Sequence, residues 1–192
     1  MAAMLLSGPA SEPLMLAEAK AHLKVDTNDE DGLIQTLITA ARLHVETLTE
    51  RALITQNWRL IRDAWPRGRV LQIPIGPVQA INDVRIYDDD DVVATVSAEN
   101  YLVEVAGVPA RLAMRGGRAW PKPGRALAGI EIDFTAGYGP EPQHVPASLR
   151  QAVLLLAAHW FTHREPVALG NAPLPVPGTV DALLSAYKRQ RL

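Results

Sequence analysis

Two histidines have the spacing of metal ligands. His159 and His163 stand four residues apart in a stretch with helical periodicity, and at that spacing two imidazoles on a helix can share a zinc ion. The zinc-protease motif also needs a glutamate directly after the first histidine, and Trp160 occupies that position. No third ligand stands at a recognisable spacing. We therefore interpret the pair as histidines on the surface of a helix, with a small metal-binding hydrolase as the alternative.

Two acidic runs have the composition of cation sites. The first, Asp26–Gly32, resembles the opening of a calcium-binding loop, but an EF-hand needs glycine at its sixth position and a carboxylate at its twelfth. Those positions hold Asp31 and Leu37, so the run is better explained as residues that cap a following helix. The second run, Asp88–Asp91, is explained by the solvated tip of a hairpin. Neither run predicts a metal site.

The sequence lacks phosphate-binding and nucleophilic motifs. Gly137, Tyr138 and Gly139 precede a helical stretch but lack the third glycine of a dinucleotide-binding loop. The serines do not stand in a nucleophile-elbow context, and there is no cysteine to act as a nucleophile or a thiolate ligand. We therefore predict that the protein is not an enzyme and that it binds no cofactor.

The first helical signals lie near the N-terminus. Good helix formers span Leu16–Leu23, and capping residues at 27–31 precede a second helix that extends to about Arg51. A second apolar flank on this helix is formed by Leu33, Ala40 and Leu43. Such a flank faces either a wide core or another subunit, and we name its three residues as the candidate subunit interface. The main apolar stripe of the helix is formed by Ile34, Leu37, Ile38, Ala41, Val45 and Leu48.

Between residues 54 and 138 the apolar periodicity changes to two, which is typical of half-buried strands. Turn residues, above all glycine, proline and aspartate, separate the alternating segments. Short strands at this spacing predict an antiparallel sandwich or barrel rather than βαβ units. The candidate strands are Ile54–Ile61, Arg69–Ile73, Val78–Tyr87, Val92–Val96, Tyr101–Val105, Arg111–Met114 and Gly129–Thr135.

The helical period returns after residue 139. Pro146 opens a helix that extends to Arg164, with Trp160 on its buried face. Four prolines then exclude regular structure from Glu165–Gly178, which we expect to be a mobile or partner-ordered loop. The apolar stripe of a last, short helix follows, formed by Val180, Leu183, Leu184 and Tyr187.

These elements predict an α+β fold. It has a helical core of two long and two short helices, with a large antiparallel β insertion between the second and third helices. We predict an N-terminal helical part at residues 1–53, a β lobe at 54–138, and a C-terminal helical part at 139–192 that contains the proline-rich loop 165–178. Because each long helix has one apolar stripe to bury, we expect Asp29–Arg51 and Pro146–Arg164 to pack against each other.

The composition is that of a soluble globular protein. Of 192 residues, 48% are hydrophobic and 21% are charged, with a net charge of −2 at pH 7. This balance lacks the basic surplus that drives binding to a phosphate backbone. The apolar start, Met1–Leu6, has no basic flank, and no run approaches the ~20 apolar residues of a membrane span. We expect an intracellular protein that contacts no membrane.

The order and spacing of several short motifs resemble those of a known family. The motifs are Pro13–Val25, Asp29–Asp31, Arg51–Trp58, Ile132–Gly139, Val145 with Pro146, and Leu149–Trp160. On these residues the chain resembles the head–tail connector, or adaptor, proteins of tailed bacteriophages and gene transfer agents, from about residue 14 to 187. One position departs from the pattern, because Met15 stands where relatives often carry the serine or threonine cap of the first helix.

The resemblance implies a structural role. Such connectors form a ring, typically dodecameric, below the portal at the capsid vertex, and they carry the tail-side stopper or terminator. The implied partners are thus further copies of the chain, the portal, a tail-side protein, and DNA that passes through the ring without specific binding. The implied location is the neck of a virion or gene-transfer-agent particle assembled in the bacterial cytoplasm. The alternative is another neck or tail-completion protein.

The resemblance also implies a role for the C-terminus. In related connectors the C-terminal segment docks onto the portal, so we predict that the last helix and its basic tip bind the portal. The alternative is a helix that folds back on its own domain. The predicted portal-binding residues are Leu183, Leu184, Tyr187, Lys188, Arg189 and Arg191.

Overall fold

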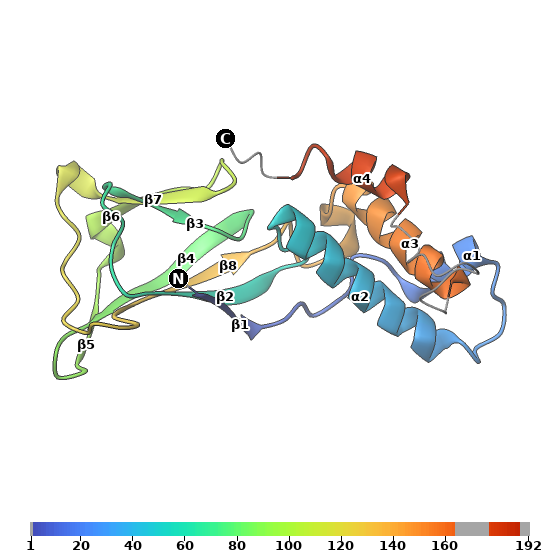
Figure 1. The fold of residues 1–192 in the computed structure, drawn as a ribbon, viewed down its shortest axis with the longest axis horizontal. Helices are drawn as coiled ribbons and strands as arrows, with labels where there is room; N and C mark the ends of the chain where they lie inside the picture. Colours follow the sequence, from blue (N-terminus) through green and yellow to red (C-terminus); the bar gives the residue numbers. More distant parts are fainter. Residues whose placement is uncertain (1, 164–176, 189–192) are drawn as a thin grey trace, which may run out of the picture. The chain divides into compact units, whose positions relative to one another are not determined.

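The computed structural model describes residues 2–163 and 177–188 (Figure 1). The chain divides into two compact units, each assembled from separate segments. A β unit combines Met1–Pro9 with Thr55–Tyr138, and a helical unit combines Ala10–Ile54 with Gly139–Leu192. The predicted α+β class, with two long and two short helices and antiparallel strands, is confirmed.

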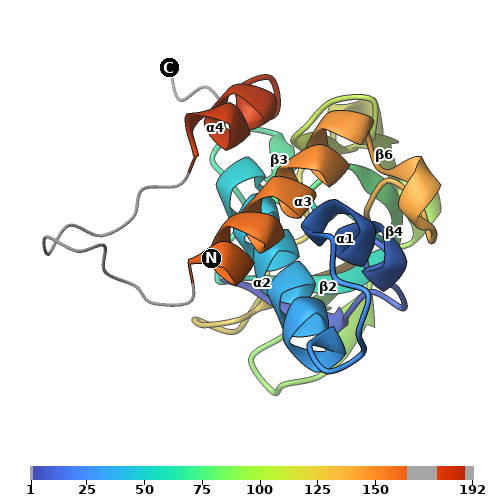
Figure 2. The same cartoon turned by 90° about the vertical axis from the view of Figure 1, so that its right-hand side faces the viewer.

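The helical unit contains α1 (Leu16–Leu23), α2 (Asp31–Thr49), α3 (Ala147–Thr162) and α4 (Gly178–Leu184). Figure 2 shows α2 and α3 packed together, with α1 and α4 beside them. The predicted contact between the two long helices is therefore confirmed. Within the described residues no helix combines the length and the apolar character that crossing a bilayer requires.

The core of the helical unit follows the apolar stripes of the two long helices. On α2, Ile34, Ile38 and Val45 are fully buried, and Trp160 of α3 packs edge-to-face on His44 with ring centroids 5.8 Å apart. The prediction that Leu48 lies on the buried stripe of α2 is wrong, because Leu48 is 38% exposed. On α3 the buried side chains are Leu149, Ala152, Val153, Leu156 and Ala157.

A charged residue occupies the core position that the apolar pattern of α2 leaves open. Arg42 is buried, and its guanidinium lies 2.7 Å from Glu12 and 2.8 Å from Glu46. Burial opposes the charge, but hydrogen bonds and the charges of the two carboxylates outweigh it and raise the pKa of Arg42. Glu46 also accepts the backbone N–H of Leu53 at 2.8 Å. This ion cluster fixes the segments that flank α2.

The predicted helix caps differ in detail from the observed ones. The acidic run before α2 makes no side-chain cap, because the N-cap residue is Glu30 and its side chain accepts no cap hydrogen bond. The run instead ties α1 to α2, since Lys20 donates to Asn28 at 2.9 Å and to Asp31 at 2.6 Å. Without a serine or threonine cap, α1 still begins at Leu16, because Glu18 accepts the backbone N–H of Met15 at 2.9 Å.

The β unit consists of two antiparallel sheets. Its five-stranded sheet has the order β1 (Ala2–Ser7), β2 (Gln56–Arg62), β8 (Ile130–Ala136), β4 (Val78–Tyr87) and β5 (Val93–Thr95). Its three-stranded sheet has the order β3 (Val70–Ile73), β7 (Ala110–Met114) and β6 (Tyr101–Glu104). All seven candidate strands are present within two residues of their predicted ends.

Alternation along the strands builds the core of the β unit. On β8, Ile130, Ile132 and Phe134 are fully buried, and the side chains between them are half-buried on the other face. The three-stranded sheet lies over the apolar face and contributes Leu71, Ile73 and Leu112 (Figure 1). The second face of the five-stranded sheet is therefore left to polar side chains.

Strand β1 was not predicted from the sequence. Residues 1–53 were expected to be helical, but Ala2–Ser7 pairs with β2 in the β unit, with Ala3 opposite Leu60 and Leu5 opposite Trp58. The segment has no apolar alternation because both of its faces are exposed. Its partner strand is also more than fifty residues away in sequence, so no local pattern reveals the pairing.

Candidate interaction surfaces

The histidine pair on α3 does not form a metal site with other described residues. The rings of His159 and His163 lie 4.6 Å apart, and Nδ1 of His163 is 2.9 Å from the backbone oxygen of His159. Burial, and then the neighbouring His163, lower the pKa of His159. Within residues 2–163 and 177–188 no group of three histidine or acidic side chains is placed to hold a metal ion. Nothing in the structure supports the hydrolase alternative.

The aspartates between β4 and β5 form a hairpin tip, as predicted. The carboxylate of Asp88 accepts the backbone N–H groups of Asp90 and Val92 at 3.0 and 2.8 Å, which closes the turn. Asp91 pairs with Arg125, whose hydrogen bond and charge lower the pKa of the Asp91 carboxyl. Asp89 and Asp90 are exposed, and the carboxylate of Asp89 lies beside Gly124.

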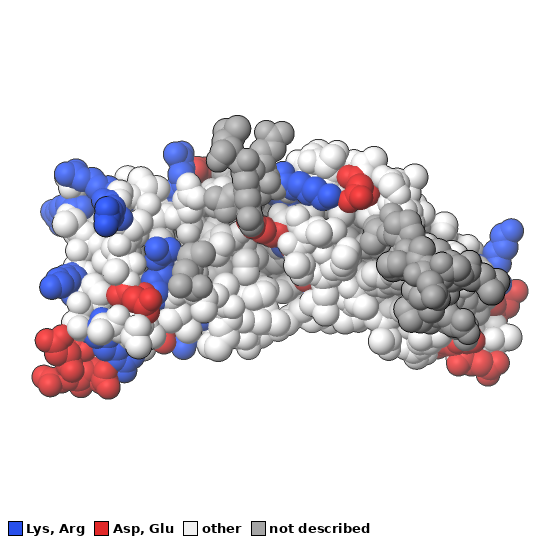
Figure 3. Space-filling model, viewed as in Figure 1, with Lys and Arg blue, Asp and Glu red and all other residues white. Residues whose placement is uncertain are grey.

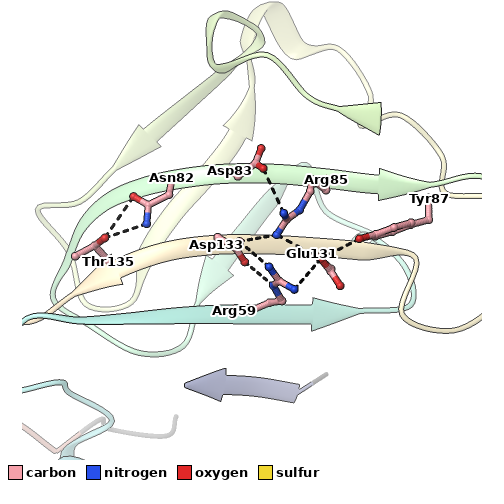
Figure 4. Close-up of polar contacts among 8 residues, drawn as sticks. All are labelled: Arg59, Asn82, Asp83, Arg85, Tyr87, Glu131, Asp133 and Thr135. Carbon is pink, nitrogen blue, oxygen red and sulfur yellow. Dashed lines mark hydrogen bonds and ion pairs between the residues drawn. The ribbon is translucent and has the colours of Figure 1, made fainter. Parts of the chain in front are cut away.

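The polar face of the five-stranded sheet holds an ion network (Figure 4). The strand register places Arg59 opposite Asp133 and Arg85 opposite Glu131, so both arginines reach both carboxylates. Arg59 donates to Asp133 at 2.7 and 2.9 Å. Sequence reasoning missed this network because Arg59 and Asp133 are separated by 74 positions and meet only through the pairing of β2 with β8.

Neighbouring groups in this network shift the pKa values of Asp133 and Tyr87. The Arg59 hydrogen bond, opposed by burial and helped by the charge of Arg85, lowers the pKa of the Asp133 carboxyl. Burial and a hydrogen bond to Glu131 raise the pKa of Tyr87. The opposite charges of Arg59 and Asp133 therefore stabilise each other. Such an arrangement links neighbouring strands and stiffens the sheet.

The hollow beside α1 offers no catalytic arrangement either. It has a volume of about 470 Å³. Its polar lining includes the ion pair of Lys20 with Asp31, and a charge satisfied in this way is structural. The other lining residues are Leu16, Ala17, Ala21, Val25 and Asp26.

The predicted subunit-interface residues lie on α2. Leu43 is 51% exposed, and Leu33 and Ala40 are half-buried. Leu48 is also exposed, but it stands five residues beyond Leu43 and points about 140° away around the helix. Leu43 is therefore an isolated exposed apolar side chain that a partner could cover. Its role in an interface stays a prediction.

A second apolar surface lies on β1, the edge strand that sequence reasoning missed. Met4, Leu5 and Leu6 are 45%, 45% and 43% exposed. Among the described residues the strand pairs only with β2, so its other edge has no strand partner there. It carries no charged residue or proline, the usual protection of an exposed edge.

The C-terminal helix folds onto its own unit. Val180 and Leu184 are fully buried, and α4 packs on α3. The hydroxyl of Tyr187 lies 2.9 Å from that of Ser148, and the guanidinium of Arg51 lies 5.4 Å from the centre of the Tyr187 ring. For Leu184 and Tyr187 the structure therefore agrees with the alternative in which the last helix folds back on its own domain.

The outward side of α4 is open. Leu183 is half-buried, and Lys188 is exposed and paired with Asp181 at 2.8 Å. Two of the predicted portal-binding residues, Arg189 and Arg191, lie outside the described residues, as does most of the predicted loop 165–178.

Three solved structures match the chain over its full length. The first, described as "Neck of empty GTA particle computed with C6 symmetry", is 30% identical with a TM-score of 0.86, and the match covers 100% of this chain and 97% of that one. The second, "Virion of native gene transfer agent (GTA) particle", is 28% identical with a TM-score of 0.83 and the same coverage. The third, "Neck of native GTA particle computed with C12 symmetry", is 28% identical with a TM-score of 0.80 and again the same coverage.

A family model points to the same class of protein. Residues 13–91 match the model described as "Phage gp6-like head-tail connector protein". A search of curated proteins gave no match. The matched range contains the N-terminal motifs on which the resemblance rests, and the solved structures extend the similarity through α4. The chain therefore belongs to the phage head–tail connector family and is a structural connector subunit.

Proposed function

We propose that twelve copies of this chain form a ring in the neck of a phage-like particle, below the portal, where the ring joins the capsid to the tail and lets DNA pass. The observation that carries the proposal is the full-length match, at 30% identity, to a chain of a gene-transfer-agent neck. The copy number is taken from a related neck with twelvefold symmetry. We further propose that the protein acts as a structural part and catalyses no reaction.

The exposed apolar side chains support assembly into a ring. A cyclic ring needs two different complementary surfaces on each subunit. The chain offers the open edge of β1 and the exposed Leu43 on α2. Leaving these surfaces in water is unfavourable, at roughly 25 cal/mol for each Å² of apolar area. A ring that covers them removes this penalty.

The C-terminal helix supports a portal contact through its outward side. Its inward residues, Val180 and Leu184, are already buried, so a partner can reach only the other side, which includes Leu183 and Lys188. We propose that this side of α4, with the basic tip that follows it, binds the portal. A tail-side stopper or terminator is proposed to bind the opposite end of the ring.

Another neck or tail-completion protein is the remaining alternative. The family match favours the connector, because it covers residues 13–91, where a helix-first opening leads into the β unit. Assembly in the bacterial cytoplasm follows from the proposed role.

Electron microscopy of the purified protein with its portal tests the proposal. We expect class averages in which a ring of this protein sits coaxially on one end of the portal. The Lys188→Glu variant serves as the comparison for the C-terminal contact, because Lys188 is exposed and its substitution leaves the buried side of α4 intact. Particles in which the protein binds a tail component but leaves the portal bare would favour the alternative.

A further inference from the structure

One end of the β unit carries five exposed basic side chains that form no ion pair with a carboxylate within residues 2–163 and 177–188. They come from the segment before β3 and the segment after β7, and we call them the basic patch. Elsewhere in the unit, exposed cations are compensated, as Arg111 is by Glu104 at 3.0 Å. The basic patch consists of Arg67, Arg69, Arg115, Arg118 and Lys122.

A stacked tryptophan pair holds the two segments together. The rings of Trp65 and Trp120 lie 4.1 Å apart and nearly parallel, at 13°. The indole N–H of Trp65 donates to the backbone oxygen of Pro121 at 2.8 Å, and that of Trp120 donates to the backbone oxygen of Arg69 at 3.3 Å. The patch is therefore presented on a fixed support rather than on free loops.

The strand register and a glycine turn complete this support. Val70 of β3 pairs with Ala113 of β7, so the strand ends that lead into the two segments lie side by side. Gly116 and Gly117 have φ angles of +64° and +67°, which other residues adopt only with strain. They turn the chain sharply between Arg115 and Arg118. Like charges held together in this way repel one another, and an acidic partner would relieve the repulsion.

The same unit carries an acidic surface that adjoins the Lys122 end of the patch, because Gly124 lies against Asp89. Asp88–Asp91, at the tip between β4 and β5, form what we call the acidic hairpin. Within the part of the chain that the structure describes, only Asp91 of the four is paired with a cation, and Asp89 and Asp90 are exposed. Figure 3 shows the acidic hairpin as the red group at the lower left and basic side chains at the upper left, over the end of β7. On the face drawn in Figure 3, the two groups lie apart at the same end of the β unit.

We propose that the basic patch of one copy binds the acidic hairpin of the next copy. This inference rests on the proposed ring. Two different complementary surfaces on one subunit can form a heterologous contact, and repetition of that contact around an axis closes a ring when the rotation closes. Charge complementarity of this kind steers association and rejects wrong pairings, since like charges that face each other cost several kcal/mol.

Two charge-reversed variants test the contact. The patch variant carries Arg67→Glu, Arg115→Glu, Arg118→Glu and Lys122→Glu, and retains Arg69 because its guanidinium lies against Gly117. The hairpin variant carries Asp88→Asn, Asp89→Lys and Asp90→Lys. Asparagine keeps the side-chain oxygen that closes the turn, and the paired Asp91 is unchanged. A control with Asp26→Lys and Asp29→Lys adds a similar positive charge on exposed positions of the helical unit.

In a ring made of either variant alone, side chains of the same charge would face each other at every contact between neighbouring copies. We expect the protein concentration at half-assembly, measured by mass photometry with portal present, to rise about tenfold or more for each variant, because about 1.4 kcal/mol corresponds to tenfold. The control should assemble like the wild type. Circular dichroism should show folded protein in every case.

The decisive experiment uses an equimolar mixture of the two variants. The patch variant is acidic on both surfaces and the hairpin variant is basic on both, so the two can alternate around a ring that has an even number of copies. We expect the mixture to recover rings with equal numbers of each variant by native mass spectrometry. Recovery of this kind cannot result from two variants that simply fail to fold.

Three outcomes would overturn the contact. In the first, the wild type forms rings and either variant assembles as well as the wild type. In the second, the wild type forms rings but the mixture of the two folded variants does not. The third is a patch variant that assembles normally but loses retention on a duplex DNA oligonucleotide, because the patch would then be a nucleic-acid surface. Failure of the wild type itself to form rings would instead contradict the proposed function, and this contact with it.

Discussion

At the scale of single residues, the chain uses its charges to hold structure together. Asp133 lies between Arg59 and Arg85 on the polar face of the sheet, and Arg42 lies between Glu12 and Glu46 in the helical unit. The sequence could argue against chemistry at the histidine pair, because the needed glutamate was visibly missing. It could not reveal the ion network, because that network depends on strand register across a long separation.

Asp133→Asn is expected to destabilise the β unit by about 1–3 kcal/mol, because two half-buried guanidinium groups lose one of the two carboxylates that compensate them. The substitution is nearly isosteric, so packing is preserved. Chemical denaturation followed by circular dichroism measures the effect. Asp29→Asn, at an exposed position without a partner ion, is the matched control. Equal stability of the two variants would contradict the structural role of the network.

The lowered pKa of Asp133 also predicts the acid sensitivity of the unit. The folded-state pKa lies below the unfolded value of about 4. The stabilisation is therefore complete above about pH 4 and is lost as the pH falls through the folded-state pKa. We expect the unfolding temperatures of wild type and Asp133→Asn to converge as the pH falls from 6 to 2. A constant difference over that range would show that the ionised carboxylate is not the cause.

At the scale of elements, the sequence predicted what local periodicity can report. The four helices and seven strands follow apolar stripes and turn residues, and they were found close to the predicted positions. Strand β1 was missed because an exposed edge strand has no buried face and so leaves no alternation in the sequence. The packing of α4 was left open, because a short amphipathic helix has the same stripe whether it covers its own unit or a partner.

The two sides of α4 should respond differently to substitution. Leu184 is fully buried, so Leu184→Ala is expected to destabilise the helical unit by about 2–5 kcal/mol. Lys188→Glu changes an exposed residue, so stability should stay within about 0.5 kcal/mol, while attachment to the portal weakens. Thermal unfolding and co-sedimentation with portal measure the two effects. Unchanged attachment of Lys188→Glu would remove this residue from the portal contact.

At the scale of the whole molecule, the near-neutral net charge conceals a separation of charge. The chain has a net charge of −2, yet the basic patch and the acidic hairpin form separate charged groups at one end of the β unit. The sequence showed that positive and negative charges nearly balance, but it did not show that the basic residues gather in one patch. That patch forms because Trp65 and Trp120 bring together residues from distant segments. The family resemblance could be predicted from the order of motifs, since that order records the arrangement of elements.

Duplex DNA should bind weakly to the assembled protein. A channel through which DNA slides cannot hold phosphates tightly, and in a ring the basic patch would be covered by carboxylates. We expect a Kd weaker than about 1 µM at physiological salt, as is typical of non-specific binding. Fluorescence anisotropy with a labelled duplex measures it, with the isolated subunit as the comparison. Submicromolar binding by the ring would contradict this account of the channel.

The copy number of the assembled protein tests the central claim most directly. The proposed ring of twelve copies of a 20.9 kDa chain has a mass of about 250 kDa. Native mass spectrometry of the protein assembled with portal, followed by release of the ring, measures this mass. We predict a closed species of twelve copies with no ladder of larger polymers. A strict monomer, or an open series of polymers without a preferred size, would contradict the assignment as a ring-forming connector.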